Sequence, residues 1–179
     1  MRVIAGKFKG TPLSSPKSDK VRPTGDKVKE AVFTKLAFDL PGARVLDLFC
    51  GSGALGIEAL SRGASEVVFV DKNRDSAELT KKNLEKVEVK TPVYCRDALL
   101  ALKAVKQPFD IIFLDPPYMS KLYTPALQLI REKELLKEDG IIVCEHAKEQ
   151  QIDFVGFEVF DAKVYGTVQL SYLRGECGN

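Results

Sequence analysis

Residues 45–56 read Val-Leu-Asp-Leu-Phe-Cys-Gly-Ser-Gly-Ala-Leu-Gly, and their pattern indicates the fold of the chain. The apolar first half predicts a buried β-strand, the middle is a glycine turn, and the end opens an amphipathic helix. Glycine at positions 51 and 53 lets the backbone turn tightly and approach a ligand closely. The spacing Gly51-x-Gly53-x-x-Gly56 fits the fingerprint of nucleotide-binding folds, although strand-to-helix turns also use glycine for structural reasons.

Outward from this turn the chain alternates buried strands with amphipathic helices, which predicts a mostly parallel sheet covered by helices on both faces. The end of the chain breaks the rhythm, because two strands meet around Gly166 with no room for a helix. We therefore predict an α/β, Rossmann-like fold with a C-terminal antiparallel hairpin. The expected strands are 44–49, 66–70, 92–95, 109–114, 141–144, 157–165 and 167–173, and the expected helices are 54–62, 74–86, 98–105 and 125–136.

The chain begins with a basic arm. Residues 1–29 carry eight basic and two acidic side chains, whereas the whole chain has a net charge of only +2. This asymmetry predicts a polyanionic partner, but the charge alone fits a solvated, poorly ordered terminus equally well. Glycine and proline predict extended pieces and turns in the arm, followed by a helix with Thr24 as its N-cap. We expect one domain over residues 1–179, with 1–23 as a substrate-binding arm.

Two carboxylates at strand ends favour S-adenosylmethionine over a dinucleotide as ligand. Asp47 precedes the glycine turn, where it would repel a pyrophosphate but could hold the amino group of a methionine moiety, directly or through water. Asp71 ends the next strand, 18 residues after Gly53. It can accept hydrogen bonds from both ribose hydroxyls, and the structural alternative is that it caps the following helix.

A further contact to the adenine is expected after the third strand, at Arg96-Asp97-Ala98. Asp97 can accept a hydrogen bond from the adenine amine or cap the next helix, and one residue can do both. The predicted donor-binding residues are Asp47, Gly51, Gly53, Asp71, Lys72, Arg96, Asp97 and Ala98.

The turn Asp115-Pro116-Pro117-Tyr118 directly follows a buried strand. Ligands of open α/β sheets bind beyond the carboxyl ends of the strands, so this turn is expected to face the same cleft as the glycine turn. Pro117 lacks a backbone donor and both prolines stiffen the turn, which presents the Pro116 carbonyl in a fixed direction beside Asp115. The alternative is a rigid loop that only stops the strand.

This pair of acceptors suits methyl transfer to an aromatic amine, which is a poor nucleophile because its lone pair is delocalised into the ring. The Asp115 carboxylate and the Pro116 carbonyl can each take one N–H, which aims the nitrogen lone pair at a sulfonium methyl and stabilises the cationic nitrogen. Tyr118 can stack on a base that has left its helix. We predict Asp115, Pro116 and Tyr118 as catalytic residues.

With these motifs, the chain resembles the bacterial RsmD-type methyltransferases over nearly its whole length. The resemblance implies a class I methyltransferase fold with seven strands and a reversed last strand. It also implies S-adenosylmethionine as donor, S-adenosylhomocysteine as product, and the N2 amine of a guanine in small-subunit ribosomal RNA as acceptor. The matching blocks are residues 2–10, 22–24, 46–63, 70–71, 96–98, 115–118, 165–167 and 169–170.

The expected partner is ribosomal RNA or a partly assembled small ribosomal subunit. Basic side chains of the arm would contact phosphates. The predicted RNA-binding residues are Arg2, Lys7, Phe8, Lys9, Arg22 and Thr24.

Three other functions remain open from the sequence. Asp-Pro-Pro-Tyr by itself is shared with adenine-N6 methyltransferases of DNA or RNA, but the segments between strands are short for the target-recognition insertion that such DNA enzymes usually carry. A non-catalytic nucleic-acid-binding Rossmann-like module would be favoured by a lost or altered motif, and the motif is intact. A nicotinamide dehydrogenase fits least, because of Asp47.

The remaining composition excludes several classes of protein. The four cysteines contain no CxxC pair and the chain has one histidine, so we predict no metal site and reduced, mostly buried cysteines. No apolar run is long enough for a membrane-spanning helix or a secretory signal. We expect a cytoplasmic monomer.

Overall fold

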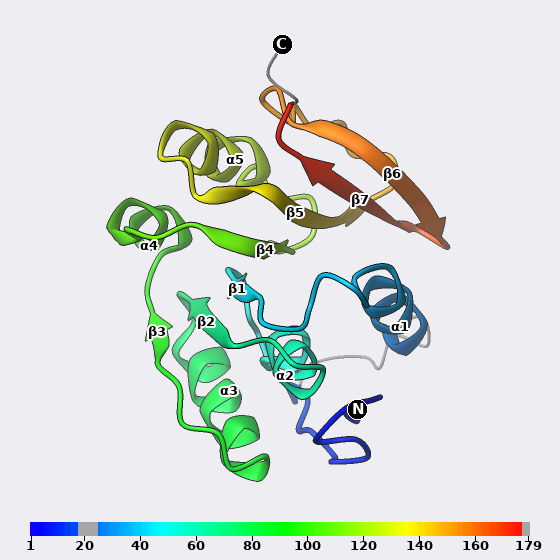
Figure 1. Cartoon of the computed structure of the whole chain (residues 1–179), viewed down its shortest axis with the longest axis vertical. Coiled ribbons are helices and arrows are strands. Elements are labelled where there is room, and N and C mark those ends of the chain that lie inside the picture. Colours follow the sequence, from blue (N-terminus) through cyan, green and yellow to red (C-terminus); the bar gives the residue numbers. More distant parts are fainter. Residues whose placement is uncertain (18–24, 177–179) are drawn as a thin grey trace.

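The computed structural model describes residues 1–17 and 25–176. Its centre is a seven-stranded sheet, and Asp47 ends one of the central strands (Figure 1). The strand order is β3-β2-β1-β4-β5-β7-β6. Strands β1 to β5 run parallel, and β7 is antiparallel to both β5 and β6. The strands are β1 (Arg44–Asp47), β2 (Glu66–Asp71), β3 (Val93–Cys95), β4 (Phe109–Leu114), β5 (Leu136–Ala147), β6 (Glu158–Tyr165) and β7 (Val168–Arg174).

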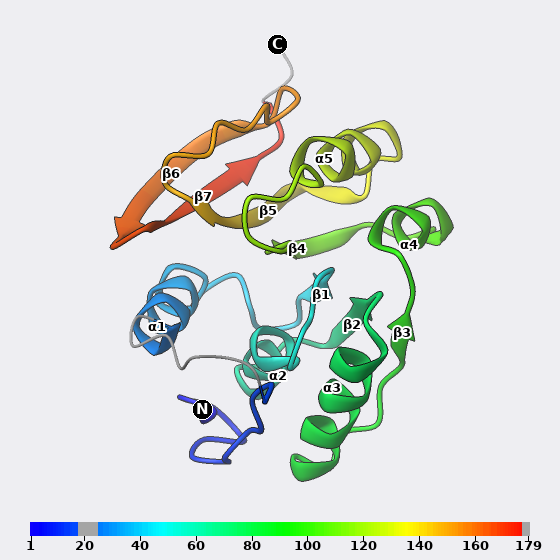
Figure 2. The ribbon, with the colours of Figure 1, turned by 180° about the vertical axis from the view of Figure 1, so that it is seen from behind.

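Helices cover both faces of the sheet. Helices α1, α2 and α3 pack on one face, and α4 and α5 pack on the other (Figures 1 and 2). In the described part of the chain no helix is long and apolar enough to cross a membrane. The helices are α1 (Gly25–Lys35), α2 (Ala54–Ser61), α3 (Arg74–Lys86), α4 (Ala98–Ala104) and α5 (Tyr123–Glu132).

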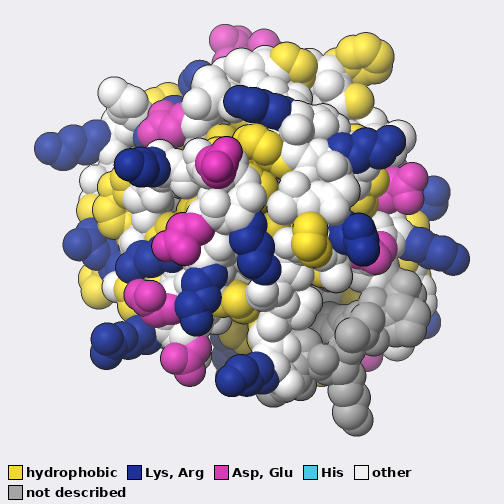
Figure 3. Space-filling model, turned by 90° about the horizontal axis from the view of Figure 1, so that it is seen from below, with side chains coloured by type: hydrophobic (Ala, Val, Ile, Leu, Met, Phe, Trp, Pro, Cys, Tyr) yellow, Lys and Arg dark blue, Asp and Glu magenta, His cyan; other side chains and the backbone are white. Residues whose placement is uncertain are grey.

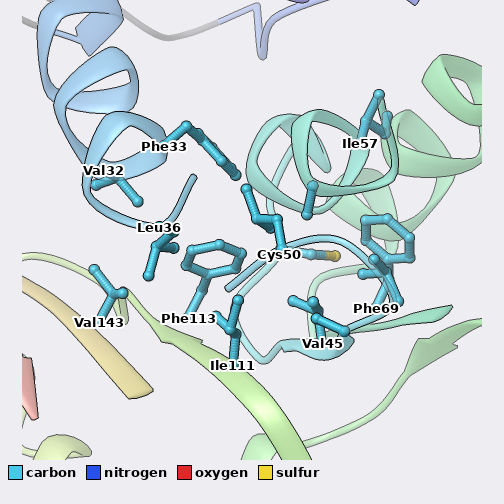
Figure 4. Close-up of a cluster of buried hydrophobic side chains, with 14 of the residues drawn as sticks. Val32, Phe33, Leu36, Val45, Cys50, Ile57, Phe69, Ile111, Phe113 and Val143 are labelled. Carbon is cyan, nitrogen blue, oxygen red and sulfur yellow. The ribbon is translucent and has the colours of Figure 1, made fainter. Parts of the chain in front are cut away.

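The two-residue period of the strands divides the apolar side chains between two cores. Val45 pairs with Ile111 and faces α1 to α3, whereas Leu46 pairs with Ile112 and faces α4 and α5. In the first core, the rings of Phe33 from α1 and Phe113 from β4 lie 5.8 Å apart (Figure 4). Both faces of the central strands are thus buried, which explains why their sequences are apolar at nearly every position.

The predicted order of strands and helices is confirmed, including the C-terminal hairpin. The predicted bounds of the last helix, 125–136, are wrong. Helix α5 begins at Tyr123, so that Pro125 occupies the first turn, where its missing N–H is not needed. The helix ends at Glu132, because Glu134 takes a left-handed conformation (φ 52°) and Leu135 donates to the Ile130 carbonyl. Leu136 then begins β5. The periodicity of the segment did not reveal this stop.

Candidate active site

Four acidic residues follow the carboxyl ends of four neighbouring strands. Asp47 and Asp71 end β1 and β2, Asp115 comes directly after β4, and Asp97 lies two residues beyond the end of β3. These strands are parallel and adjacent, so the four residues lie along one edge of the sheet. The structure therefore brings the glycine turn and the Asp-Pro-Pro-Tyr turn to the same edge, as expected from the sequence.

The Asp71 carboxylate holds the glycine turn against β2. One oxygen accepts a hydrogen bond from the Gly51 amide and the other from the Asn73 amide, both at 2.9 Å. Asn73, not Asp71, is the N-cap of α3, because its side chain accepts from the Ser76 amide. The helix-cap alternative for Asp71 is therefore wrong. Each Asp71 oxygen has a second lone pair with which it can accept a ligand hydroxyl.

Asp47 is buried beneath the glycine turn, with 2% of its surface exposed. One carboxylate oxygen accepts a hydrogen bond from the Gly56 amide at 3.0 Å. Burial raises the pKa of Asp47 to about 7, the Gly56 hydrogen bond opposes this, and the negative charge of Asp71 adds to it. A buried carboxylate with a raised pKa is stabilised by a nearby cation, so this position suits an ammonium group.

Two buried residues of α3 that the sequence analysis missed fix the other side of the turn. Thr80 donates to the Gly51 carbonyl at 2.8 Å, and Asn83 donates to the Ser52 carbonyl at 2.9 Å. The Gly51 carbonyl and the Ser52 N–H belong to the same trans peptide and therefore point in opposite directions. Because the carbonyl faces Thr80, the Ser52 N–H is directed away from α3. A side chain at Gly53 would lie 2.8 Å from Thr80, whereas Gly51 has open space in that direction. Gly53 is therefore needed for packing and Gly51 is accessible.

A signal for these two residues was present in the sequence. The buried stripe of α3 includes Ala77, Thr80, Asn83 and Leu84, which follow helical spacing. Two hydrogen-bonding side chains on the buried face of a helix require partners in the neighbouring element. The identity of those partners follows only from the packing of α3 on the glycine turn.

Asp97 is the N-cap of α4. A single carboxylate oxygen accepts from the Leu99 amide at 3.0 Å and from the Leu100 amide at 3.1 Å. The capping role expected for Asp97 is confirmed, and its adenine contact stays a prediction. Ala98 is buried, while Arg96 and Lys72 are exposed.

The Asp-Pro-Pro-Tyr turn projects beyond the end of β4. Pro116 is buried, Asp115 is exposed, and Tyr118 has 68% of its surface exposed. Behind the turn, the hydroxyl of Tyr123 donates to the Glu145 carbonyl at 2.5 Å. Burial and, next, the negative charge of Asp115 raise the pKa of the Tyr123 phenol and the Cys144 thiol. Both groups therefore stay neutral at neutral pH.

The basic arm is attached to the protein surface and is not a loose terminus over residues 1–17. Val3 and Leu13 are buried in the first core, and the Val3 and Gly10 amides form backbone hydrogen bonds within the arm. Ser61, the last residue of α2, accepts from the Lys7 amide through its carbonyl and from the Phe8 amide through its hydroxyl. The alternative of a poorly ordered terminus is therefore wrong for this segment.

Two of the predicted RNA-binding residues, Lys7 and Phe8, lie at the end of α2 that is farther from the glycine turn. Helix α2 has eight residues, so this end is about 10 Å from the turn. Lys7 and Lys9 are exposed, and Phe8 is partly buried against the core, with the Lys7 ammonium 5.6 Å from its ring. Arg2 is exposed, and Arg22 and Thr24 lie outside the described residues. Lys and Arg side chains are spread over this face of the molecule (Figure 3).

Cys50 belongs to the glycine turn, where its Sγ lies 3.4 Å from the Thr80 hydroxyl. Cys50 and Cys144 are buried, Cys95 is exposed, and these three cysteines are free. His146 is buried between the Ala147 carbonyl and the Ser171 hydroxyl, each 2.9 Å from a ring nitrogen. Among the described residues there is no group of three His, Cys, Asp or Glu side chains that could hold a metal ion.

The strand order, the reversed β7 and the glycine turn beside acidic strand ends define a Rossmann-like methyltransferase of the S-adenosylmethionine-dependent class. The solved structure of the Escherichia coli protein yhhF superposes with a TM-score of 0.85 at 32% identity, covering 98% of both chains. YlbH of Bacillus subtilis (strain 168) is 45% identical over 97% of this chain and 98% of its own.

Ribosomal RNA small subunit methyltransferase D of Haemophilus influenzae is 37% identical over 85% of this chain and 81% of its own. A family model described as conserved hypothetical protein 95 matches residues 1–174. The chain belongs to this family, which includes the ribosomal RNA small subunit methyltransferases D.

Proposed function

We propose that this protein transfers a methyl group from S-adenosylmethionine to the exocyclic N2 amine of a guanine in small-subunit ribosomal RNA. The observation that carries the proposal is the Asp-Pro-Pro-Tyr turn after β4, which shares a sheet edge with the glycine turn after β1 in a member of this family. The adenine-N6 and non-catalytic alternatives have no comparable support, since relatives over most of the chain are named as methyltransferases of small-subunit ribosomal RNA.

The residues at this edge fit the donor. Asp47 is a buried carboxylate that gains from a cation, which matches the ammonium of the methionine moiety. The Ser52 amide is directed away from α3 and can donate to a carboxylate. Asp71 retains acceptor capacity for ribose hydroxyls, and the oxygen of Asp97 that does not cap α4 can accept from the adenine amine. When bound, S-adenosylmethionine supplies an electrophilic methyl on a sulfonium and leaves as S-adenosylhomocysteine.

The remaining predicted donor contacts are part of the same proposal. Gly51 and Gly53 shape the turn, Lys72 and Arg96 come directly after β2 and β3, and Ala98 begins α4 at the same edge. The proposed donor site requires no metal ion.

At the acceptor side, Asp115 and the Pro116 carbonyl orient the target amine. Each accepts one N–H, so the nitrogen lone pair is free to react, and both acceptors bind more strongly as the nitrogen becomes cationic. Guanine presents its N1–H beside the N2 amine, and a carboxylate accepts from both donors, whereas adenine has an acceptor at N1. Tyr118 is exposed and can stack on the extruded base.

The RNA, free or within a partly assembled small subunit, would lie across this edge and the arm. Lys7 and Lys9 are exposed and can contact phosphates, and Arg2, Phe8, Arg22 and Thr24 complete the proposed contact set. We place the protein in the cytoplasm, acting as a monomer in which the whole chain forms one methyltransferase domain.

The proposal is tested by incubating the protein with labelled S-adenosylmethionine and total RNA from cells that lack it, followed by nucleoside analysis. We expect label in N2-methylguanosine from the small-subunit RNA, and we expect a chelator to leave the rate unchanged. Label in N6-methyladenosine, or in no nucleoside, would overturn the proposal.

A further inference from the structure

Asn83 joins the basic arm to the glycine turn through one buried side chain. Its amide nitrogen donates to the Ser52 carbonyl at 2.9 Å and to the Ser14 carbonyl at 3.0 Å. Its amide oxygen accepts from the Ser14 backbone N–H at 2.8 Å. Asn83 therefore pairs with Ser14 as a neighbouring β-strand would, and its second N–H is used on the turn.

Water cannot replace these bonds, because the Asn83 side chain is completely buried. A carbonyl that loses a buried donor keeps the full cost of its desolvation, so arm and turn are held in one arrangement. Thr80, one turn earlier on α3, holds the adjacent Gly51 carbonyl. A shift of Ser14 is therefore transmitted to the peptide groups that surround the proposed donor.

A second attachment runs through α2, which begins directly after Gly53. The buried Glu58 carboxylate accepts from the Ile4 amide at 2.9 Å and from the Ala5 amide at 3.1 Å. The arm is thus fixed to both helices that pack beside the turn. Ser14 differs from the other arm residues because its bonds reach the same side chain that binds the turn itself.

We propose that Asn83 is a positioning residue that couples RNA binding by the arm to donor binding at the glycine turn. RNA that holds the arm in place reduces the freedom of Ser14, Asn83 and the Ser52 peptide, so the donor then binds an already ordered turn. Thermodynamic linkage requires that the donor tighten RNA binding by the same factor. This inference rests on the proposed function, because it takes the arm as an RNA contact.

The test measures the dissociation constant of S-adenosylhomocysteine with and without saturating small-subunit RNA from cells that lack the protein, by calorimetric titration. For the wild-type protein we expect RNA to tighten this binding by about fivefold or more. In Asn83→Asp, which can accept from Ser14 but cannot donate to either carbonyl, we expect this factor to fall to about one. The factor is a ratio within each protein, so a uniform loss of affinity does not change it.

Ser14→Ala is the matched control. Asn83 contacts only the backbone of Ser14, so this variant loses the hydroxyl contact to Lys86 and should keep the wild-type factor. If Asn83→Asp does not fold, Ser14→Pro replaces it, because proline removes the N–H that donates to Asn83 and leaves the Ser52 bond in place. We expect a reduced factor in Ser14→Pro as well.

The outcomes separate this inference from the proposed function. If wild-type protein neither binds nor methylates the RNA, the proposed function fails. If it methylates the RNA but the factor is about one, or is equal in wild type and Asn83→Asp, the role of Asn83 as a coupling residue is refuted while the proposed function stands.

Discussion

The two turns at the edge of the sheet are built in opposite ways. The glycine turn is held by three buried or partly buried side chains, since Asp71 accepts from the Gly51 amide while Thr80 and Asn83 donate to turn carbonyls, and Asp47 is buried beneath it. The Asp-Pro-Pro-Tyr turn is stiffened by its own prolines and leaves Asp115 and Tyr118 exposed. A partly buried turn held by neighbouring side chains suits a small ligand that is always the same, whereas an exposed turn suits a base that a large RNA brings into place. Changes in the first turn should therefore affect donor affinity, and changes in the second should affect the methyl-transfer step.

The largest effect is expected at the exposed turn. Asp115→Ala should lower the single-turnover methylation rate by about 10²–10³, because one preorganised group that stabilises the developing charge is lost. The affinity for S-adenosylhomocysteine should stay close to wild type, since the proposed donor contacts are on other strands. The measurement is single-turnover methylation of the RNA by the folded variant, with calorimetry on the same sample. A rate near wild type would leave this turn as scaffold only.

Next in size is the effect of removing the carboxylate that holds the glycine turn. Asp71→Ala should weaken binding of S-adenosylhomocysteine by roughly 1.5–3 kcal/mol, because hydrogen bonds to a charged acceptor are lost and the Gly51 amide loses its partner. Calorimetric titration measures this loss. Asn73→Ala is the control, since it removes the cap of α3 and leaves the carboxylate intact. Equal donor affinity in Asp71→Ala and wild type would remove Asp71 from the donor site.

A pH dependence should distinguish the buried acid of the first turn. The pKa of Asp47 is raised to about 7, so this residue is largely protonated at pH 6 and ionised at pH 8. An ammonium group binds the ionised form, and donor affinity should therefore rise by up to about tenfold between these two pH values. Asp47→Asn should lack this rise. Comparing the two proteins cancels any titration of the ligand itself, and identical pH profiles would contradict the assignment.

The same residue has a consequence for the stability of the ligand-free protein. The folded state binds the Asp47 proton more tightly than the unfolded state, whose pKa is near the ordinary 3.8. The stabilising contribution is complete below pH 4 and is lost as the pH rises through about 7. The midpoint temperature of thermal unfolding should therefore decrease more between pH 5 and pH 8 for the wild-type protein than for Asp47→Asn.

The smallest effect is expected far from both turns, in the arm. Replacing Lys7 and Lys9 by Ala should raise the Michaelis constant for RNA and lower the salt slope of RNA binding by roughly 0.7–0.9 per lost phosphate contact. The affinity for S-adenosylhomocysteine without RNA should not change. Lys103→Ala on α4, across the sheet from the arm, is the control. An unchanged salt slope in the arm variant would assign the arm a purely structural role.

The order of strands and helices, the reversed C-terminal hairpin and the ends of the strands that carry the site could all be predicted from the sequence. These features depend on local periodicity and on turn chemistry, which neighbouring residues specify. Glycine at 51 and 53 and the two prolines after Asp115 are visible for this reason. Where a local signal was weak, as at the left-handed Glu134, the predicted boundary of α5 was wrong.

How these elements support one another depends on tertiary packing and could not be predicted from the sequence. The hydrogen bonds of Asn83 reach residues 31 and 69 positions away, and those of Glu58 to the arm span more than 50 positions. Such partners depend on which faces of helices and turns pack together, and helical spacing shows only that a buried polar side chain needs a partner. The burial of Asp47 and the attachment of the basic arm have the same origin, because both arise from contacts between elements that are distant in the chain.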